Sequence, residues 1–255
     1  MHRAAATTTG AAAPPRRPRL SRRSVRMTRR LRLSISVLCV DQTRLEQELT
    51  KIAALGVDRV HIDVIDPSYG NVGLPPELIS DLQARLTMPV DVHVMLAEPE
   101  HLLPLILDRR PAALCLHQCS LTPRAISMAK SAAESGVEVG LVLDGDERAE
   151  PWVVDAVEPQ RLTVMSVVPG GVGRPFRPEA VNTVRAAASW VGRSSVRRVE
   201  VDGAISPERV TSLLDAGADS FVLGSSVFPV REAFPNRLAE LWAAVEDRPE
   251  KENRQ

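Results

Sequence analysis

The chain has 255 residues, 44% of them hydrophobic and only 3% aromatic, a length and composition that suit one large domain with an aliphatic core. Its formal net charge is +0, and no apolar run approaches the roughly 18 residues that a membrane-spanning helix needs, so we do not expect an integral membrane protein. The three cysteines, Cys39, Cys115 and Cys119, show no CxxC spacing and no disulfide framework, which favours a reducing, cytoplasmic location.

Residues 1–30 differ from the rest of the chain in charge. They contain nine Arg and no Asp or Glu, so 32 minus nine leaves 23 basic against 32 acidic residues in 31–255. The segment has no hydrophobic periodicity and is predicted to be a disordered extension. It is interpreted as a transit peptide for organelle import, a nucleic-acid-binding arm, or an extension before a true start at Met27. The acidic body argues against general nucleic-acid binding.

From residue 31 onward, short β-branched runs alternate with longer amphipathic stretches. The short runs predict strands over 31–38, 57–65, 89–96, 112–117, 137–143, 161–168, 196–202 and 219–225. The longer stretches predict helices near 42–54, 75–86, 98–109, 121–135, 148–156, 177–191, 206–216 and 229–246. Ser206 before Pro207 is typical of a capped helix start, and Gly56, Gly136 and Gly217 follow predicted helix ends.

Eight βα repeats in one chain predict a (β/α)8 TIM barrel, with an open doubly wound sheet as the alternative. We expect residues 31–248 to form a single catalytic barrel domain, and 249–255 a flexible tail. A barrel of this type carries its active site at the C-terminal ends of its strands. Candidate residues should therefore fall late in their strands.

Ionisable residues interrupt strands that should be apolar when buried in a parallel sheet. His61, Asp63, His93 and Asp202 come from three predicted strands, and two imidazoles with two carboxylates suit Zn, Mn, Fe or Co. The alternative is that each is a satisfied polar core residue or an ion pair. Glu200 shares a face with Asp202, either as support for the site or as a member of an ion pair inside the barrel.

Glycine-rich loops follow two of the later predicted strands. Residues 169–173 read PGGVG, and residues 224–226 read GSS. Backbone N–H groups exposed by such turns bind phosphate near the last strands of many barrels. A metal next to a phosphate site predicts a small phosphorylated substrate with chelating oxygens.

The order of these motifs resembles the ribulose-phosphate 3-epimerase family over about 33–228. The resemblance is carried by SISVLCVD (34–41), HIDVID (61–66), DVHVM (91–95), His117, GLVLD (140–144), VMSVVPGGVGRPF (164–176), EVDGAISPE (200–208) and AGADSFVLGSSVF (216–228). It implies epimerisation of D-ribulose 5-phosphate to D-xylulose 5-phosphate through an enediolate. It also implies a homo-oligomer.

The resemblance further implies roles for individual residues. One divalent metal would be held by His61, Asp63, His93 and Asp202, with Asp202 the base toward ribulose 5-phosphate and Asp63 its partner acid. The residues implied in binding the substrate are Ser36, His93, Gly170, Gly173, Gly203, Gly224 and Ser225.

The chain departs from the family pattern around the substrate but keeps the metal ligands. The departures include Ile65, Pro67, Val168, Gly171 and Ala204. They leave two alternatives open, which are epimerisation of a related phosphosugar such as a hexulose 6-phosphate, and a non-catalytic phosphosugar-binding paralogue.

Overall fold

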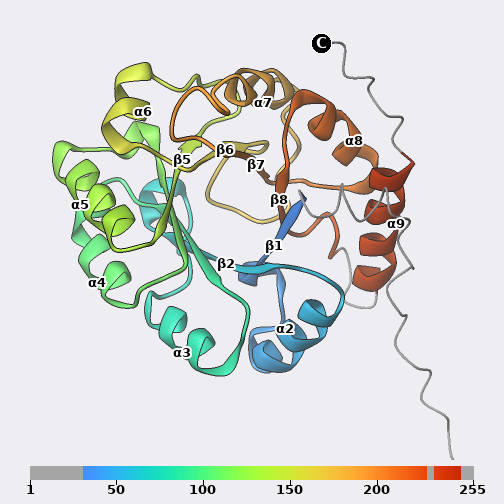
Figure 1. Ribbon diagram of the computed structural model, residues 1–255. Helices are drawn as coiled ribbons and strands as arrows, with labels where there is room; N and C mark the ends of the chain where they lie inside the picture. The colour runs from blue at the N-terminus through green and yellow to red at the C-terminus, as the bar shows by residue number, and fades with distance from the viewer. Residues whose placement is uncertain (1–30, 229–232, 248–255) are drawn as a thin grey trace, which may run out of the picture.

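A computed structural model describes residues 31–228 and 233–247, whose strands close into a barrel. All neighbouring strands pair in parallel, and β1 pairs with β8 to complete the ring, as Figure 1 shows. The strands are β1 Arg32–Ser36, β2 Arg59–Ile65, β3 Val90–Met95, β4 Ala113–His117, β5 Glu138–Leu143, β6 Arg161–Met165, β7 Arg198–Asp202 and β8 Ser220–Leu223. The TIM barrel is thus confirmed, and the open sheet is wrong.

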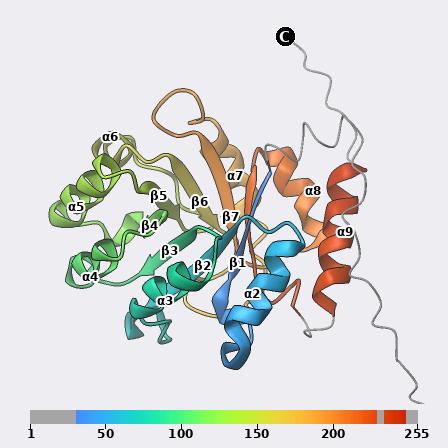
Figure 2. The ribbon, with the colours of Figure 1, turned by 60° about the horizontal axis from the view of Figure 1, so that its bottom comes forward.

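The helices lie outside the strands in a surrounding layer, which Figure 2 shows from the side. They are α2 Leu45–Ala54, α3 Glu77–Arg85, α4 Leu103–Asp108, α5 Pro123–Glu134, α6 Pro151–Val157, α7 Ala180–Ala188, α8 Pro207–Ala216 and α9 Phe234–Glu246. The helix predicted from 98 starts later, after a 3-10 turn at Pro99–His101, because Pro104 has no N–H to donate and is tolerated only in a first turn.

Two local predictions about helix ends have different outcomes. Gly217 ends α8 with a φ of 111°, a left-handed conformation that glycine adopts without the steric cost of a Cβ atom. Ser206 occupies the N-cap position of α8, but its hydroxyl makes no capping hydrogen bond. The expectations for 1–30 and 249–255 lie outside the described residues. Among the described helices, none combines the length and apolar character needed to cross a bilayer.

Side chains of each strand alternate between two environments. Those pointing outward, such as Ile62, Val92 and Val201, are buried against the helices in the main apolar core. Those pointing inward are largely polar, and several of them are fully buried, including His61 and Asp91. The alternation along each strand therefore packs the apolar side chains against the helices, where they stabilise the fold. It concentrates the ionisable side chains along the barrel axis.

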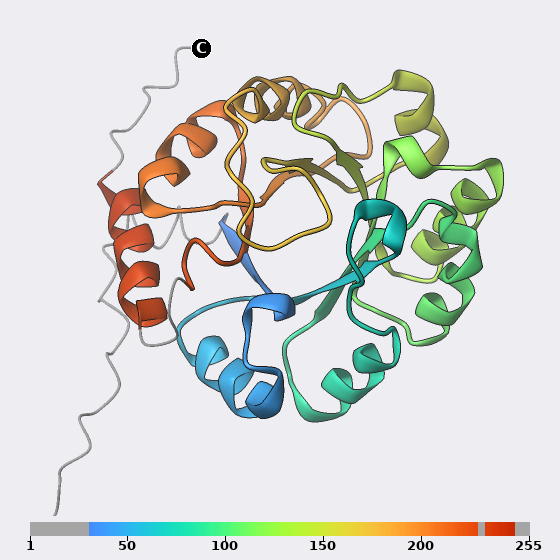
Figure 3. The ribbon, with the colours of Figure 1, turned by 180° about the vertical axis from the view of Figure 1, so that it is seen from behind.

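The loops after β2 and β6 lie over the C-terminal opening of the barrel, as Figure 3 shows in teal and gold. They touch at Gly170, whose φ is 93° and where an added Cβ atom would collide with the carbonyl oxygen of Tyr69. Glycine is required there because both the conformation and the close approach exclude a side chain. The two loops cover the interior where the polar side chains gather.

Candidate metal and phosphosugar site

Four side chains from β2, β3 and β7 converge at the C-terminal end of the barrel interior. One ligand atom from each of His61, Asp63, His93 and Asp202 lies within 4.8 Å of the others. Asp63 pairs with His93 in the β2–β3 register, and His61 precedes Asp63 by two residues, so all three share the inward face. Asp202 ends β7 and reaches the same point.

The distances within this cluster suit ligands around one cation. His61 Nε2 lies 3.5 Å from Asp63 Oδ1 and 3.6 Å from Asp202 Oδ2. His93 Nδ1 lies 3.6 Å from Asp63 Oδ1 and 3.2 Å from Asp202 Oδ2. Atoms bound to a tetrahedral cation at about 2.1 Å stand about 3.4 Å apart.

The imidazoles supply a second, independent indication. His61 and His93 are fully buried, yet Nε2 of His61 and Nδ1 of His93 make no hydrogen bond within the described part of the chain. Buried polar atoms in native proteins nearly always have a partner. Two unpartnered nitrogens directed at two carboxylates therefore fit a bound divalent cation better than a satisfied polar core.

The close approach of the imidazoles and carboxylates shifts the pKa values of all four residues when no ion is bound. Burial lowers the pKa of His61, but the neighbouring carboxylates of Asp63, Asp202 and Asp91 outweigh it and raise that pKa well above its ordinary value. The pKa of His93 is likewise raised, against burial, by Asp202 and Asp63. Burial opposes ionisation of Asp63 and Asp202, but the two imidazoles lower both of their pKa values. In the absence of a cation, the carboxylates therefore favour the protonated form of both imidazoles.

His117 stands behind His93. The two Nε2 atoms are 2.9 Å apart and the rings stack, with centroids separated by 5.0 Å. Burial and the charge of His93 keep the pKa of His117 well below its ordinary value, so this ring is neutral. With His117 neutral, the tautomer of His93 that carries its proton on Nε2 donates it to His117 and leaves Nδ1 free to face the carboxylates. Its own Nδ1 faces Asp144 Oδ1 at 3.8 Å.

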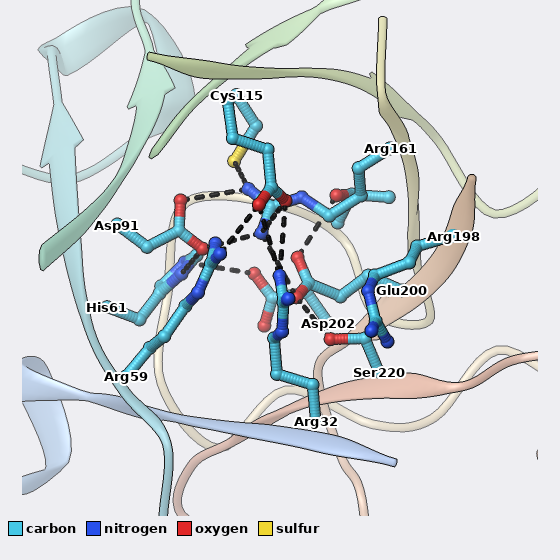
Figure 4. A network of polar contacts seen from close by, with 12 residues as sticks. Arg32, Arg59, His61, Asp91, Cys115, Arg161, Arg198, Glu200, Asp202 and Ser220 are labelled. Carbon is cyan, nitrogen blue, oxygen red and sulfur yellow. Dashed lines mark hydrogen bonds and ion pairs between the residues drawn. The ribbon is translucent and has the colours of Figure 1, made fainter. Parts of the chain in front are cut away.

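Beneath the cluster, the fully buried Arg161 crosses the barrel, as Figure 4 shows. Its Nη1 and Nη2 each donate to one oxygen of Asp91 at 2.8 Å, and Nη1 also reaches Glu200 at 3.3 Å. Thr163 and Ser220 donate to the two oxygens of Glu200. Glu200 is thus a member of an ion pair inside the barrel, the second of the two roles left open by the sequence.

The ionic column continues to the base of the barrel. Below Arg161, Glu138 on β5 accepts hydrogen bonds from Arg32 and Arg59, and Arg198 lies in the same network and pairs with Asp219. At the mouth, by contrast, the ion pairs of Asp63 and Asp202 within the described residues are with imidazoles alone. A divalent cation, or two protonated imidazoles, would balance these two carboxylates.

A cavity opens above the carboxylates, and most of the predicted substrate-binding residues line it. They are Ser36, Gly170, Gly173, Gly203, Gly224 and Ser225, together with Asp63 and Asp202. Ser36 donates to Asp63 Oδ2 at 2.8 Å, and the N–H of Gly173 donates to Ser225 Oγ at 3.1 Å. His93, also predicted to bind the substrate, is fully buried and is not part of this wall.

Three further residues of the wall bear on its chemistry. Arg174 is the one cationic side chain among the residues that line the cavity, and no ion pair joins it to the described residues. Burial and the charges of Asp63 and Asp202 raise the pKa of Cys39 to about 12, so its thiol is protonated and unsuited to nucleophilic attack. Ala204 has a φ of 49°, a backbone conformation that usually belongs to glycine.

Sequence reasoning missed Arg161 and assigned no role to Asp91. The sequence did contain a signal for Arg161. It is the first residue of a predicted barrel strand, and a basic side chain buried there requires a partner. Arg174 was quoted only as part of a motif, although its position next to a predicted phosphate loop gave a reason to single it out.

Comparisons with known proteins place this geometry in a family. Residues 32–228 match the model of the ribulose-phosphate 3 epimerase family. The chain is 31% identical over 216 residues to ribulose-phosphate 3-epimerase 2 of Cupriavidus necator, a match covering 80% of this chain and 87% of the relative. It is 30% identical over 203 residues to ribulose-phosphate 3-epimerase of Escherichia coli strain K12, covering 76% and 87%.

A solved structure with the same fold is 3-keto-L-gulonate-6-phosphate decarboxylase from Vibrio cholerae. It superposes with a TM-score of 0.62 over 86% of this chain and 99% of that one, at 12% identity. Identity this low supports the barrel fold alone, whereas the family match spans most of the chain. The chain belongs to the ribulose-phosphate 3-epimerase family.

Proposed function

We propose that this protein is a metal-dependent epimerase that interconverts D-ribulose 5-phosphate and D-xylulose 5-phosphate. The observation that carries the proposal is the convergence of two unpartnered imidazole nitrogens and two carboxylates beneath the cavity, in a chain of this family. The coarser conclusion, an epimerase acting on a phosphorylated sugar, rests on the family alone.

His61, Asp63, His93 and Asp202 would hold one divalent ion, with Zn, Mn, Fe and Co all suited to two nitrogen and two oxygen donors. When bound, such an ion stabilises the negative charge that develops on the substrate oxygens as the carbon-3 proton leaves. Asp63 and Asp202 pair with imidazoles and with no arginine of the described residues, which supports a charge of two on that ion.

Asp63 and Asp202 would move the protons. They lie on β2 and β7, with β1 and β8 between them on the barrel wall, and both line the cavity. Inversion at carbon 3 needs a base on one face of a planar enediolate and an acid on the other. Asp202 is assigned as the base toward ribulose 5-phosphate, and Asp63 returns a proton to the opposite face. The hydrogen bond from Ser36 fixes the Asp63 carboxylate in place.

The phosphate group would lie on the other side of the cavity. Gly203 has a φ of 103°, and an added Cβ atom would stand 2.5 Å from Val167 Cγ2, so the backbone there stays bare. Gly173, Gly224 and Ser225 line the same cavity, in which Gly173 N–H donates to Ser225 Oγ, and Arg174 adds a positive charge. Backbone N–H groups with a guanidinium suit an anionic group on the substrate.

A second candidate substrate class is a related ketose phosphate such as a hexulose 6-phosphate. It is favoured by the altered wall of the cavity, where Ala204 holds a conformation typical of glycine and Ile65 is another of the departures from the family pattern. These changes alter the shape of the wall while the four ligand residues are retained.

Exchange of the carbon-3 proton into deuterated water tests the proposal. The full chain, loaded separately with Zn, Mn, Fe and Co, is incubated with pentulose and hexulose phosphates and followed by NMR. We expect exchange and net epimerisation with ribulose 5-phosphate, and loss of both after chelation. Phosphosugar binding without exchange would identify a non-catalytic paralogue, and absence of any stoichiometric divalent ion would contradict the metal site.

The family also supports a homo-oligomeric enzyme of the cytoplasm whose catalytic domain is 31–248. Size-exclusion chromatography with light scattering measures the assembly. A variant that starts at Met27 tests the extension, because it should keep full stability and activity if residues 1–26 play no part in either.

A further inference from the structure

Asp91 stands directly behind the imidazole of His61, on the side away from the cavity. Asp91 Oδ2 lies 3.5 Å from His61 Nδ1, whereas His61 Nε2 faces Asp63 and Asp202. The two residues pair across the β2–β3 register, and both side chains are fully buried. This nitrogen makes no hydrogen bond within the described residues, and Asp91 is the acceptor that faces it, at 3.5 Å.

Arg161 fixes the orientation of the Asp91 carboxylate. Its Nη1 and Nη2 bind the two oxygens separately, each at 2.8 Å, in the planar bidentate arrangement that only a guanidinium provides. Gly140 makes room for it, because an added Cβ atom there would stand 3.1 Å from Arg161 Nε and 3.2 Å from Cys115 Cβ. Asp91 therefore cannot turn away from His61 without breaking this pair.

We infer that Asp91, clamped by Arg161, is a positioning residue that binds the proton of His61 Nδ1 and so directs Nε2 at the divalent ion. The inference rests on the proposed metal site and deepens it. A carboxylate behind a ligating histidine selects the ring tautomer and fixes the ring plane, and its loss typically weakens metal binding about 10–100-fold. His93 has a different support, since a neutral imidazole stands behind it.

A purely structural role for Asp91 is separable because Glu200 offers a matched control. Glu200 is equally buried and contacts the same guanidinium at 3.3 Å, but within the described part of the chain no hydrogen bond or ion pair joins it to either ligand histidine. Glu200→Gln and Asp91→Asn each remove one negative charge from the same ionic group. Only Asp91→Asn alters the environment of His61.

The experiment measures Co²⁺ binding to the full chain by competition with a chromophoric chelator, and records the visible d–d absorption of the bound ion. We expect Asp91→Asn to weaken Co²⁺ binding about 10–100-fold and to shift the absorption bands. Glu200→Gln should stay within about threefold of the unmodified protein, with unchanged bands. Thermal unfolding of the metal-free variants checks that both fold.

Arg161→Lys keeps the charge but cannot hold both oxygens of Asp91, so it decides the matter if Asp91→Asn does not fold. We expect weaker Co²⁺ binding and shifted bands from this variant as well. Unchanged affinity and bands in the folded variants, or equal losses in Asp91→Asn and Glu200→Gln, would overturn the inference. If the unmodified protein binds no Co²⁺, the proposed metal site itself fails, which is a distinguishable outcome.

Discussion

Two groups of buried polar residues, a middle layer around Arg161 and a layer at the mouth that holds the four candidate ligands, differ in how their atoms are partnered. In the middle layer, Nη1 and Nη2 of Arg161 bind Asp91 and Glu200 and hydroxyl groups complete the shell of Glu200, while Nε of Arg161 has no partner within the described residues. In the layer at the mouth, nitrogens of His61 and His93 remain without hydrogen bonds. The buried carboxylates of the middle layer are bonded at both oxygens, as suits a scaffold, whereas unpartnered nitrogens facing two carboxylates at one point indicate a ligand.

The largest expected effect concerns catalysis at the mouth. Asp202→Asn should lower net epimerisation of ribulose 5-phosphate at least about 10³-fold, because a positioned acid–base group contributes about 10²–10⁴ in rate and inversion needs both carboxylates. Coupled assay of xylulose 5-phosphate formation measures the loss.

The mirror variant Asp63→Asn separates the two roles. Asp202→Asn should lose deuterium exchange from ribulose 5-phosphate but retain some from xylulose 5-phosphate, and Asp63→Asn should show the reverse pattern. Identical exchange patterns in the two variants would contradict the assignment of one base to each face.

The middle layer should respond in stability. Arg161→Leu leaves Asp91 and Glu200 buried without their cation, and breaking a buried ion pair on one side typically costs about 3–5 kcal/mol in the free energy of unfolding. Urea denaturation of the metal-free protein measures it. A loss below about 1 kcal/mol would show that the two carboxylates are not dependent on Arg161, and the contrast between the layers would fail.

The fold could be predicted from the sequence because strand and helix signals repeat eight times. The barrel strands appear within a few residues of their predicted bounds, and the parity of His61, Asp63 and His93 along their strands places them on one inward face. Helix α4 begins later than predicted because Pro104 lies within the periodic stretch. Hydrophobic periodicity alone gives no indication that Pro104 lacks a backbone N–H.

The partners across the barrel could not be predicted in the same way. Nothing in the spacing of the residues says that Arg161 spans the interior from β6 to Asp91 on β3. That contact depends on the length of the side chain and on the space left by Gly140, both of which are properties of the closed barrel. For the same reason, the convergence of the four candidate ligands at the mouth of the barrel could be only a hypothesis from the sequence.

The protonation of the mouth layer predicts how metal affinity depends on pH. The pKa values of His61 and His93 are raised, so below those values each imidazole holds a proton that the cation must displace. Affinity should fall as the pH falls, by about tenfold per pH unit for each displaced proton. His117, with its lowered pKa, should add nothing to this slope. Co²⁺ titrations at pH 6, 7 and 8 measure the slope, and a flat response would contradict the assignment.

A comparison of Arg174 with Arg161 separates effects on substrate binding from effects on the stability of the fold. Arg174 has no ion pair with the described residues and lines the cavity, so Arg174→Gln should leave stability within about 0.5 kcal/mol. It should raise KM for ribulose 5-phosphate about tenfold, a change corresponding to about 1.4 kcal/mol, with kcat within about twofold. Steady-state kinetics measures both constants. An unchanged KM would remove Arg174 from the phosphate side of the cavity.

The smallest effect is expected at an ion pair outside both layers. Arg237 on α9 binds both oxygens of Glu208 on α8, at 3.1 and 3.2 Å, and this bonding lowers the pKa of Glu208 to about 2. A carboxyl group whose pKa is lowered by folding stabilises the protein at pH values above the ordinary pKa of that group. This contribution is lost as the pH falls toward 2.

Because the Glu208 side chain is 65% exposed, water screens the pair, and Glu208→Gln should cost less than about 1 kcal/mol at pH 7. Urea denaturation at pH 7 and pH 3 tests this, since the difference between variant and unmodified protein should shrink at the lower pH. The same bidentate chemistry holds Asp91, so a large loss at Glu208 would mean that burial is not what distinguishes the ionic groups of the interior.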